Sequence, residues 1–259
     1  MNHKVLLVSI DGLRPDAVMQ CKHPFLHEFM TRSCTYSFHG RSVIPPITLP
    51  CHMSMFHSVV PDRHGVLDNL YLRPAHHIDG LCEVLERGKK KCAFCYTWAE
   101  LRDLCRPGSL ALEDFRNYFK YEDQADRQMC ARTVELLQTE KPDFIFYYTG
   151  HTDEVAHKYG WMTPEYMDAV ALASEHMEQI VQALPPEYTM IITADHGGHG
   201  RNHGQDVPED MTIPISLYGA PWEKGKELPC IRLIDLAPTI VDLLGCEIPG
   251  NWDGTSLCR

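Results

Sequence analysis

The chain lacks the surplus of basic residues that general binders of nucleic acid or of anionic membranes need. Its 259 residues include 24 Lys and Arg against 35 Asp and Glu, which gives a formal net charge of −11. Both kinds of polyanion select a basic face, so this balance argues against a nucleic-acid polymer and against a membrane as partner. An acidic surface also repels phosphate esters. An anionic substrate would therefore need a local positive centre, which bound metal ions could provide.

Long hydrophobic runs are missing as well. No stretch approaches the ~18 apolar residues of a membrane span, and residues 1–4 lead into the apolar run 5–10 without the long apolar region of a signal peptide. The sequence shows no internal repeat, no low-complexity tract and no linker that would force a second domain. We therefore expect residues 1–259 to form one domain, whose core is supplied by the 44% of residues that are hydrophobic.

The cysteine pattern of a small secreted protein is absent too. The eleven cysteines are odd in number and scattered, which favours free thiols in a reducing cytoplasm. Cys92 and Cys95 form a C-x-x-C pair inside a strand-like run, but no second pair accompanies them. We expect buried thiols there rather than a redox or zinc site, and a cytoplasmic protein.

Short apolar runs alternate with segments of helical periodicity along the chain. Strands are expected at 5–10, 92–96, 144–148, 190–193 and 213–217, and helices at 77–87, 122–140, 163–184 and 233–244. Because Pro238 lies inside the last helix, that helix is kinked or begins later. The alternation predicts an α/β/α sandwich with a mostly parallel central sheet. The least periodic stretch, 96–121, is a candidate small cap or lid over a site.

Polar side chains follow three of these strand-like runs, at the edge where open parallel sheets bind ligands. The set consists of Asp11, Asp153, His157, Asp195, His196 and His203. Asp153 and His157 are four residues apart, which puts them on one face of a helical turn. Three carboxylates and three imidazoles are enough for two divalent metal ions with positions open to substrate. A structural zinc site would more often use thiolates.

Thr48 lies in a second segment of interest, directly before Leu49 and Pro50, and is predicted as the N-cap of a helix. In the structural interpretation its hydroxyl only caps that helix. In the functional interpretation the hydroxyl faces the metals and acts as nucleophile. A metal lowers the pKa of bound water from 15.7 to ~7 in the best zinc sites, and a helix N-terminus adds roughly half a positive charge. Both effects would activate the hydroxyl and hold a phosphoryl group.

In these motifs the chain resembles the alkaline phosphatase superfamily, and within it the type I phosphodiesterase/nucleotide pyrophosphatase branch. The resemblance runs over essentially the whole chain and implies an alkaline-phosphatase-like fold. The motifs that carry it occur in order: Ser9-Ile10-Asp11-Gly12, Ile47-Thr48-Leu49-Pro50, Pro61-Asp62-Arg63-His64-Gly65, Thr152-Asp153-Glu154-Val155-Ala156-His157, Thr193-Ala194-Asp195-His196-Gly197 and Asn202-His203-Gly204.

The resemblance implies two divalent metal ions, zinc first and manganese as the alternative, because mixed nitrogen and oxygen ligands accept both. Thr48 would lie between the two ions, attack phosphorus in line and form a phosphothreonine that water then cleaves. The implied ligands are Asp153, His157 and His203 for one ion, and Asp11, Asp195 and His196 for the other, with Thr48 as a further ligand between them.

Three further residues are candidate substrate contacts. Cys51 stands where the resemblance implies an asparagine that donates a hydrogen bond to a phosphoryl oxygen, and a thiol is a poor donor. His199 and Asn202 lie in the glycine-rich loop after the last strand-end motif. The resemblance also implies that sulfatases need a cysteine or serine nucleophile with arginine four residues on. Thr48 and His52 occupy those positions and argue against a sulfatase.

Cleavage of a small phosphodiester or pyrophosphate is the leading prediction, and hydrolysis of a phosphomonoester is the alternative. A monoester carries one more negative charge and would want another cation, for which no arginine is identifiable from the resemblance. Phosphonate hydrolysis is a third possibility, because the same nucleophile serves it. A non-catalytic protein that holds metal and a phosphorylated ligand is the rival from another class, but it leaves the alcohol at position 48 unexplained.

Overall fold

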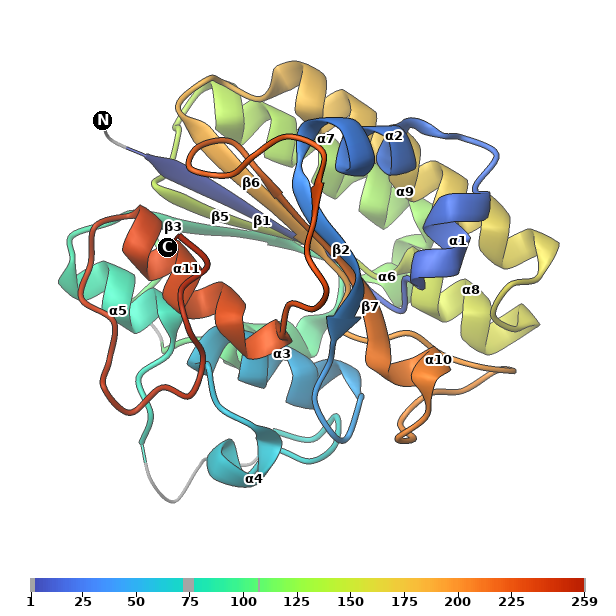
Figure 1. The fold of residues 1–259 in the computed structure, drawn as a ribbon, viewed down its shortest axis with the longest axis horizontal. Helices are drawn as coiled ribbons and strands as arrows, with labels where there is room; N and C mark the ends of the chain where they lie inside the picture. Colours follow the sequence, from blue (N-terminus) through green and yellow to red (C-terminus); the bar gives the residue numbers. More distant parts are fainter. Residues whose placement is uncertain (1–2, 72–76, 107, 259) are drawn as a thin grey trace.

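The computed structural model of the protein describes residues 3–71, 77–106 and 108–258. One sheet crosses the molecule, and helices cover both of its faces (Figure 1). Its eight strands lie in the order β4-β3-β5-β1-β6-β7-β2-β8, and β7 runs antiparallel to both of its neighbours while the other pairs are parallel. The strands are β1 Lys4–Ile10, β2 Thr35–Arg41, β3 Cys92–Tyr96, β4 Leu112–Phe115, β5 Phe144–Thr149, β6 Tyr188–Thr193, β7 Thr212–Tyr218 and β8 Lys226–Glu227.

The helices divide between the two faces of the sheet (Figure 1). One face carries α1 Pro15–Gln20, α2 Phe25–Ser33, α7 Asp123–Gln138, α8 His151–Tyr159 and α9 Pro164–Ala183; the other carries α3 Thr48–His57, α5 Leu81–Arg87 and α11 Leu236–Leu243. Shorter elements are α4 Pro61–His64, α6 Tyr118–Tyr121, α10 Pro208–Met211 and the 3-10 helices η1 Ala99–Leu104 and η2 Leu233–Asp235. The predicted α/β/α sandwich with a mostly parallel sheet is confirmed.

The central strands bring the candidate residues to one edge of the sheet. β1 pairs in parallel with β5 on one side and with β6 on the other, in a register that aligns Ile10 with Thr149 and Ser9 with Thr193. These strands are buried along almost their whole length, which explains their near-continuous apolar runs. Because their carboxyl ends lie level, the residues that follow each strand meet at the same place.

Five expected strands and four expected helices are present; the strand expected at 92–96 has the predicted bounds, and the other elements are shifted at one or both ends. The helix expected at 77–87 begins only at Leu81. The one expected at 233–244 begins as η2 and becomes α-helical at Leu236, which agrees with the late start that Pro238 suggested. Thr48 is not an N-cap: Ile47 holds that position, and Thr48 is the first residue of α3.

The segment expected as a cap, 96–121, contains η1, β4 and α6, and β4 pairs in parallel with β3 at the edge of the sheet. That it closes over the site stays a prediction. Among the described residues, no helix combines the length and the hydrophobicity that crossing a bilayer requires.

Candidate metal and phosphate site

The three strand-end carboxylates converge with two of the histidines in one buried cluster. Nε2 of His196 lies 3.3 Å from Asp11 Oδ1 and 3.3 Å from Asp195 Oδ2, and Nε2 of His203 lies 3.9 Å from Asp153 Oδ1. Within the described residues, two groups place three ligand atoms within 4.8 Å of one another: Asp11, Asp195 and His196 form one, and Asp153, His196 and His203 the other. His196 belongs to both, so the two candidate sites adjoin.

His157 reaches the cluster from α8, where it lies one turn after Asp153. Its Nε2 is 3.3 Å from Asp153 Oδ2, and its side chain is 37% exposed. Its ring centroid lies 5.1 Å from that of His203, which in turn stacks on His196 at 3.8 Å. The expected partners Asp153, His157 and His203 are thus neighbours, with His157 at the solvent side.

Backbone carbonyls orient all three imidazoles. Nδ1 of His157 donates to the carbonyl of Arg201 at 3.0 Å, Nδ1 of His196 to Gly197 at 2.8 Å, and Nδ1 of His203 to Pro46 at 2.8 Å. A neutral imidazole that donates from Nδ1 carries a lone pair on Nε2, and each of these Nε2 atoms faces a carboxylate. Metal-binding histidines are typically held in this way by a second hydrogen bond.

The carboxylates offer oxygen atoms that the protein does not satisfy. Asp11 Oδ1, Asp153 Oδ1 and Asp195 Oδ2 are buried without a hydrogen-bond partner. Burial and then the neighbouring carboxylates Asp195 and Asp153 raise the pKa of Asp11, and burial and then Asp153 raise the pKa of Asp195 to about 8. Burial lowers the pKa of His196, so its Nε2 faces two carboxylates as an acceptor. A cation between the groups would satisfy these oxygen and nitrogen atoms together, so these residues fit a divalent metal.

Thr48 stands beside this cluster as the first residue of α3. Its Oγ1 lies 3.2 Å from Nε2 of His196, and the residue is only 4% exposed. The helix that it opens is anchored by His52, whose Nδ1 donates to the carbonyl of Thr48 at 2.8 Å and whose Nε2 contacts Ser9 at 3.0 Å. Burial lowers the pKa of His52 to about 4, so its ring is neutral. The Thr48 hydroxyl is therefore placed against the ligand cluster by a buried contact to β1.

Sequence reasoning missed two side chains at the site. Asn69, in the loop after α4, accepts the backbone N–H of Leu49 on its Oδ1 at 3.0 Å, so its amide group lies at the N-terminus of α3. Tyr148 donates from its hydroxyl to Asp11 Oδ2 and leaves the other oxygen of that carboxylate for the cluster. A long-range contact places Asn69, and no local pattern marks it. Tyr148 lies near the end of β5, in a hydrophobic run that predicts a buried strand but no functional side chain.

The loop 197–205 is held by a fully buried carboxylate, Asp210. It accepts from His199 Nδ1 at 2.7 Å and from the N–H of Gln205 at 2.9 Å, and its backbone carbonyl accepts from Gly197 at 2.8 Å. His199 is thus bound to Asp210, while Asn202 is exposed and uses its Oδ1 to accept the N–H of the adjacent histidine. In this structure both residues shape the loop. A direct contact of either with substrate stays a prediction.

Cys51 lies behind the first turn of α3, and a direct contact of its side chain with substrate stays a prediction. Its side chain is fully buried, and its sulfur lies 3.2 Å from the hydroxyl of Ser42, behind the first turn of α3. Burial raises the pKa of the thiol, which keeps it protonated. Because Cys51 lies three residues after Thr48 on the helix, its side chain points toward the segment that precedes α3.

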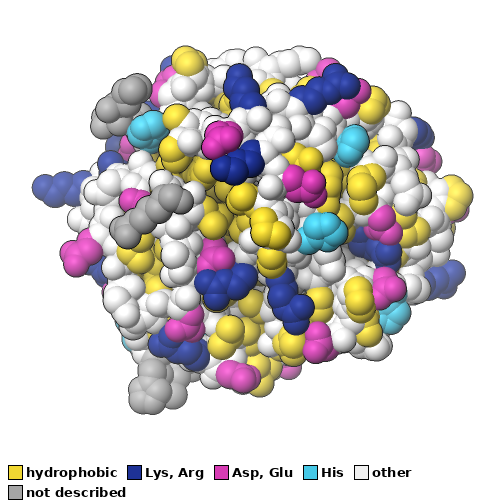
Figure 2. All heavy atoms as spheres, in the orientation of Figure 1, with side chains coloured by type: hydrophobic (Ala, Val, Ile, Leu, Met, Phe, Trp, Pro, Cys, Tyr) yellow, Lys and Arg dark blue, Asp and Glu magenta, His cyan; other side chains and the backbone are white. Residues whose placement is uncertain are grey.

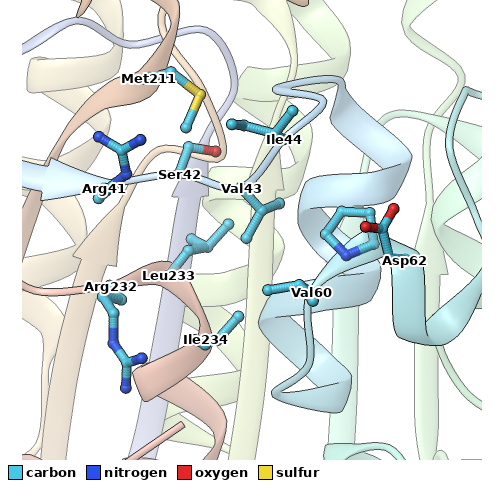
Figure 3. Close-up of a pocket in the computed structure, with 11 residues that line it drawn as sticks. Arg41, Ser42, Val43, Ile44, Val60, Asp62, Met211, Arg232, Leu233 and Ile234 are labelled. Atoms are coloured by element: carbon cyan, nitrogen blue, oxygen red, sulfur yellow. The ribbon is translucent and has the colours of Figure 1, made fainter. Parts of the chain in front are cut away.

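A cavity of about 370 Å³ lies beside the segment that connects β2 to α3, and it differs in character from the cluster. Hydrophobic side chains gather near the centre of the face seen in Figure 2. In the close-up, Val43, Val60 and Leu233 converge on the middle of the cavity, whereas the guanidinium groups of Arg41 and Arg232 point away in opposite directions (Figure 3). The cavity therefore has no focused positive charge for a phosphate.

Comparisons with known proteins show the type of fold and the family. The fold is alkaline-phosphatase-like: murine ectonucleotide pyrophosphatase/phosphodiesterase 5, an inactive form in complex with AMP, superposes with a TM-score of 0.82 at 14% identity, covering 97% of each chain. A 2-O glycosaminoglycan sulfatase, BT1596, superposes with a TM-score of 0.77 at 15% identity, covering 99% of this chain and 73% of the other. The model of the family described as type I phosphodiesterase / nucleotide pyrophosphatase matches residues 5–206. The chain belongs to this family.

Curated relatives are much longer than this chain. Ectonucleotide pyrophosphatase/phosphodiesterase family member 3 of Rattus norvegicus is 22% identical over 219 residues, which cover 74% of this chain and 24% of that protein. GPI ethanolamine phosphate transferase 3 of Eremothecium gossypii is 29% identical over 114 residues, which cover 38% of this chain and 11% of that protein. The shared part is therefore a fraction of each relative.

Proposed function

We propose that the chain is a metal-dependent phosphohydrolase of the phosphodiesterase/nucleotide pyrophosphatase type, with Thr48 as its nucleophile. The observation that carries the proposal is the position of the Thr48 hydroxyl, 3.2 Å from His196 at the edge of a cluster of buried carboxylates. An alcohol at the first position of a helix, next to a site that needs cations, is suited to attack an anionic phosphorus centre.

Two divalent ions, zinc or manganese, would be held by Asp11, Asp195 and His196 on one side, and by Asp153, His157 and His203 on the other. When bound, they would supply positive charge that holds phosphoryl oxygens and favours the ionised form of the Thr48 hydroxyl. Support comes from the three unsatisfied carboxylate oxygens and from the Nδ1 hydrogen bonds that turn each Nε2 toward a carboxylate.

The residues of the chain then divide the reaction into two displacements. Thr48 Oγ1 forms a bond to phosphorus while the bond to the leaving oxygen breaks, and the leaving group departs as an alcohol or a phosphate. Water next attacks the phosphothreonine, and the bond between phosphorus and Thr48 breaks, which restores the hydroxyl. Asn69, whose Oδ1 is occupied by Leu49, would donate from its amide nitrogen to a phosphoryl oxygen and orient it.

The substrate that we propose is a small phosphodiester or pyrophosphate. Monoesters and phosphonates are the alternatives, and a non-catalytic ligand-binding role is the more distant one. Among the described residues, the ion pairs of the cluster join aspartates to histidines and include no arginine. A monoester would want a further cation for its extra charge, so this favours a diester. A cytoplasmic location stays a prediction.

The test compares wild type with Thr48→Ala and Thr48→Ser after loading with zinc or manganese. The substrates are a bis-aryl phosphate, an aryl monophosphate, an aryl phosphonate and an aryl sulfate. We expect the diester to be preferred, Thr48→Ser to keep part of the activity, and Thr48→Ala to lose it with its metal content unchanged. Undiminished diester hydrolysis by Thr48→Ala with metal bound would disprove the nucleophile, and a dominant sulfate rate would disprove the reaction class.

A further inference from the structure

Three thiols outside the candidate metal site lie together, on or next to α5, β3 and η1. Cys82, near the start of α5, is fully buried, and burial and the neighbouring thiols of Cys105 and Cys92 raise its pKa. Cys92 opens β3 and is fully buried as well. Cys105 directly follows η1 and is partly exposed. Cys82 is therefore the central member of a cluster that reaches solvent only through Cys105.

Cys105 borders a cavity of about 560 Å³ on the surface. The exposed Arg102 and Arg106 border the same cavity, together with the carboxylates Asp103 and Glu113. Asp103 lies 3.8 Å from Arg102, and Glu113 accepts a hydrogen bond from a tyrosine. Cys105 thus borders a space that a small solute can enter, and the two guanidinium groups can pair with a solute that carries carboxylates.

A hydrogen bond from a backbone N–H to a side-chain carboxylate keeps the two cysteine segments side by side. The N–H of Arg106, the residue after Cys105, donates to Oε1 of Glu83, the residue after Cys82, at 2.7 Å. Glu83 is only 6% exposed, so this link is protected from water. The proximity of Cys82 and Cys105 therefore has a structural support besides their own contact.

A metal site is not the better explanation of this cluster. Among the described residues, the two groups that gather three or more ligand atoms within 4.8 Å both belong to the site already described. The sulfurs of Cys82, Cys92 and Cys105 form no such group, so pairwise sulfur chemistry is favoured over joint coordination.

We propose that Cys105 is a modification site for small, carboxylate-bearing disulfides of the glutathione type, and that Cys82 resolves the adduct into an internal Cys82–Cys105 disulfide. In the first step the Cys105 thiolate attacks one sulfur of glutathione disulfide, whose S–S bond breaks and releases glutathione. In the second, the Cys82 thiolate attacks the Cys105 sulfur and releases the second glutathione. The two protein thiols lose two electrons and two protons, and the disulfide gains them as two glutathione thiols.

The second step should be the slower one at neutral pH, because a buried thiol with a raised pKa supplies little thiolate. The mixed disulfide on Cys105 should accumulate first, and its conversion to the internal disulfide should quicken as the pH rises. Because η1 and α5 both pack against α3, the internal disulfide would join two supports of the helix that carries Thr48.

The experiment incubates the full chain with glutathione disulfide, blocks free thiols by alkylation at successive times, and maps each cysteine by mass spectrometry. We expect glutathionyl-Cys105 to appear first and then a Cys82–Cys105 linked peptide. In Cys82→Ser the glutathionyl adduct should persist on Cys105, and in Cys105→Ser no linked peptide should form. Cys230, which is exposed, is the internal control: its adduct should persist in every variant.

Three outcomes would overturn the proposal. The first is a Cys105 that stays reduced while Cys230 is modified. The second is an adduct on Cys105 that persists in wild type as long as it does in Cys82→Ser. The third is an internal disulfide between Cys82 and Cys92 instead.

Discussion

Replacing Asp195 with asparagine should stabilise the metal-free protein. Oδ2 of Asp195 is buried without a hydrogen-bond partner, and the ligand atoms of Asp11, Asp195 and His196 lie within 4.8 Å of one another. Two unit charges at that separation repel by about 3.5 kcal/mol at an effective dielectric constant of ~20. Proton uptake by one carboxyl relieves part of this repulsion, so we expect Asp195→Asn to raise the free energy of unfolding by about 1–2 kcal/mol.

With zinc bound, wild type should become more stable than Asp195→Asn. A ligand that binds only the folded state at one hundred times its dissociation constant stabilises it by about 2.7 kcal/mol, and Asp195→Asn lacks a charged ligand and should gain much less. Urea unfolding with chelator and with zinc measures both effects. Asp62→Asn removes an exposed carboxylate and should show neither. If Asp195→Asn is the less stable protein without metal, or keeps the full zinc response, the reasoning is refuted.

Three further predictions concern groups around the site and in the core. Burial lowers the pKa of His64 from 6.5 to about 4. Between pH 4 and 6.5 the unfolded state therefore binds more protons than the folded state. The free energy of unfolding should fall by up to about 3 kcal/mol as the pH drops from 6.5 to 4. His64→Gln should flatten the dependence of the urea midpoint on pH. In Gly198→Ala the new Cβ would lie 2.3 Å from the ring of Trp161. This substitution should lower the free energy of unfolding in urea by about 1–3 kcal/mol and change the tryptophan fluorescence. Gly250→Ala, which has open space around its Cβ, should change neither. Asp210→Asn should lower the metal content of the zinc-loaded protein, measured by emission spectrometry, because an NH2 group replaces one of the two buried oxygens that hold the loop carrying His203. An unchanged metal content would contradict that role.

The central strands were predictable because their signal is local. β1, β5 and β6 are buried on both faces, so their residues form uninterrupted apolar runs that no solvated element would tolerate. β2 was not predictable from its own residues, because Thr35–Arg41 includes a serine, a histidine and a glycine. Its pairing with β7 and β8 supplies the order that its composition does not indicate. Long-range pairing therefore decided what local propensity left open.

The same division applies to the candidate site. The carboxylates and two of the imidazoles could be predicted because each follows a recognisable strand or lies one helical turn after such a residue, and His203 lies in the loop that continues from β6. Their orientation could not, because it depends on backbone atoms. The carbonyls of Pro46, Gly197 and Arg201 decide which ring nitrogen of each histidine faces the carboxylates, and a carbonyl is present at every position of any sequence. Asn69 is missed for a related reason, since its role depends on a long-range contact with the N–H of Leu49. Substitutions that move these loops without changing a proposed ligand should therefore impair metal binding as strongly as some ligand substitutions do.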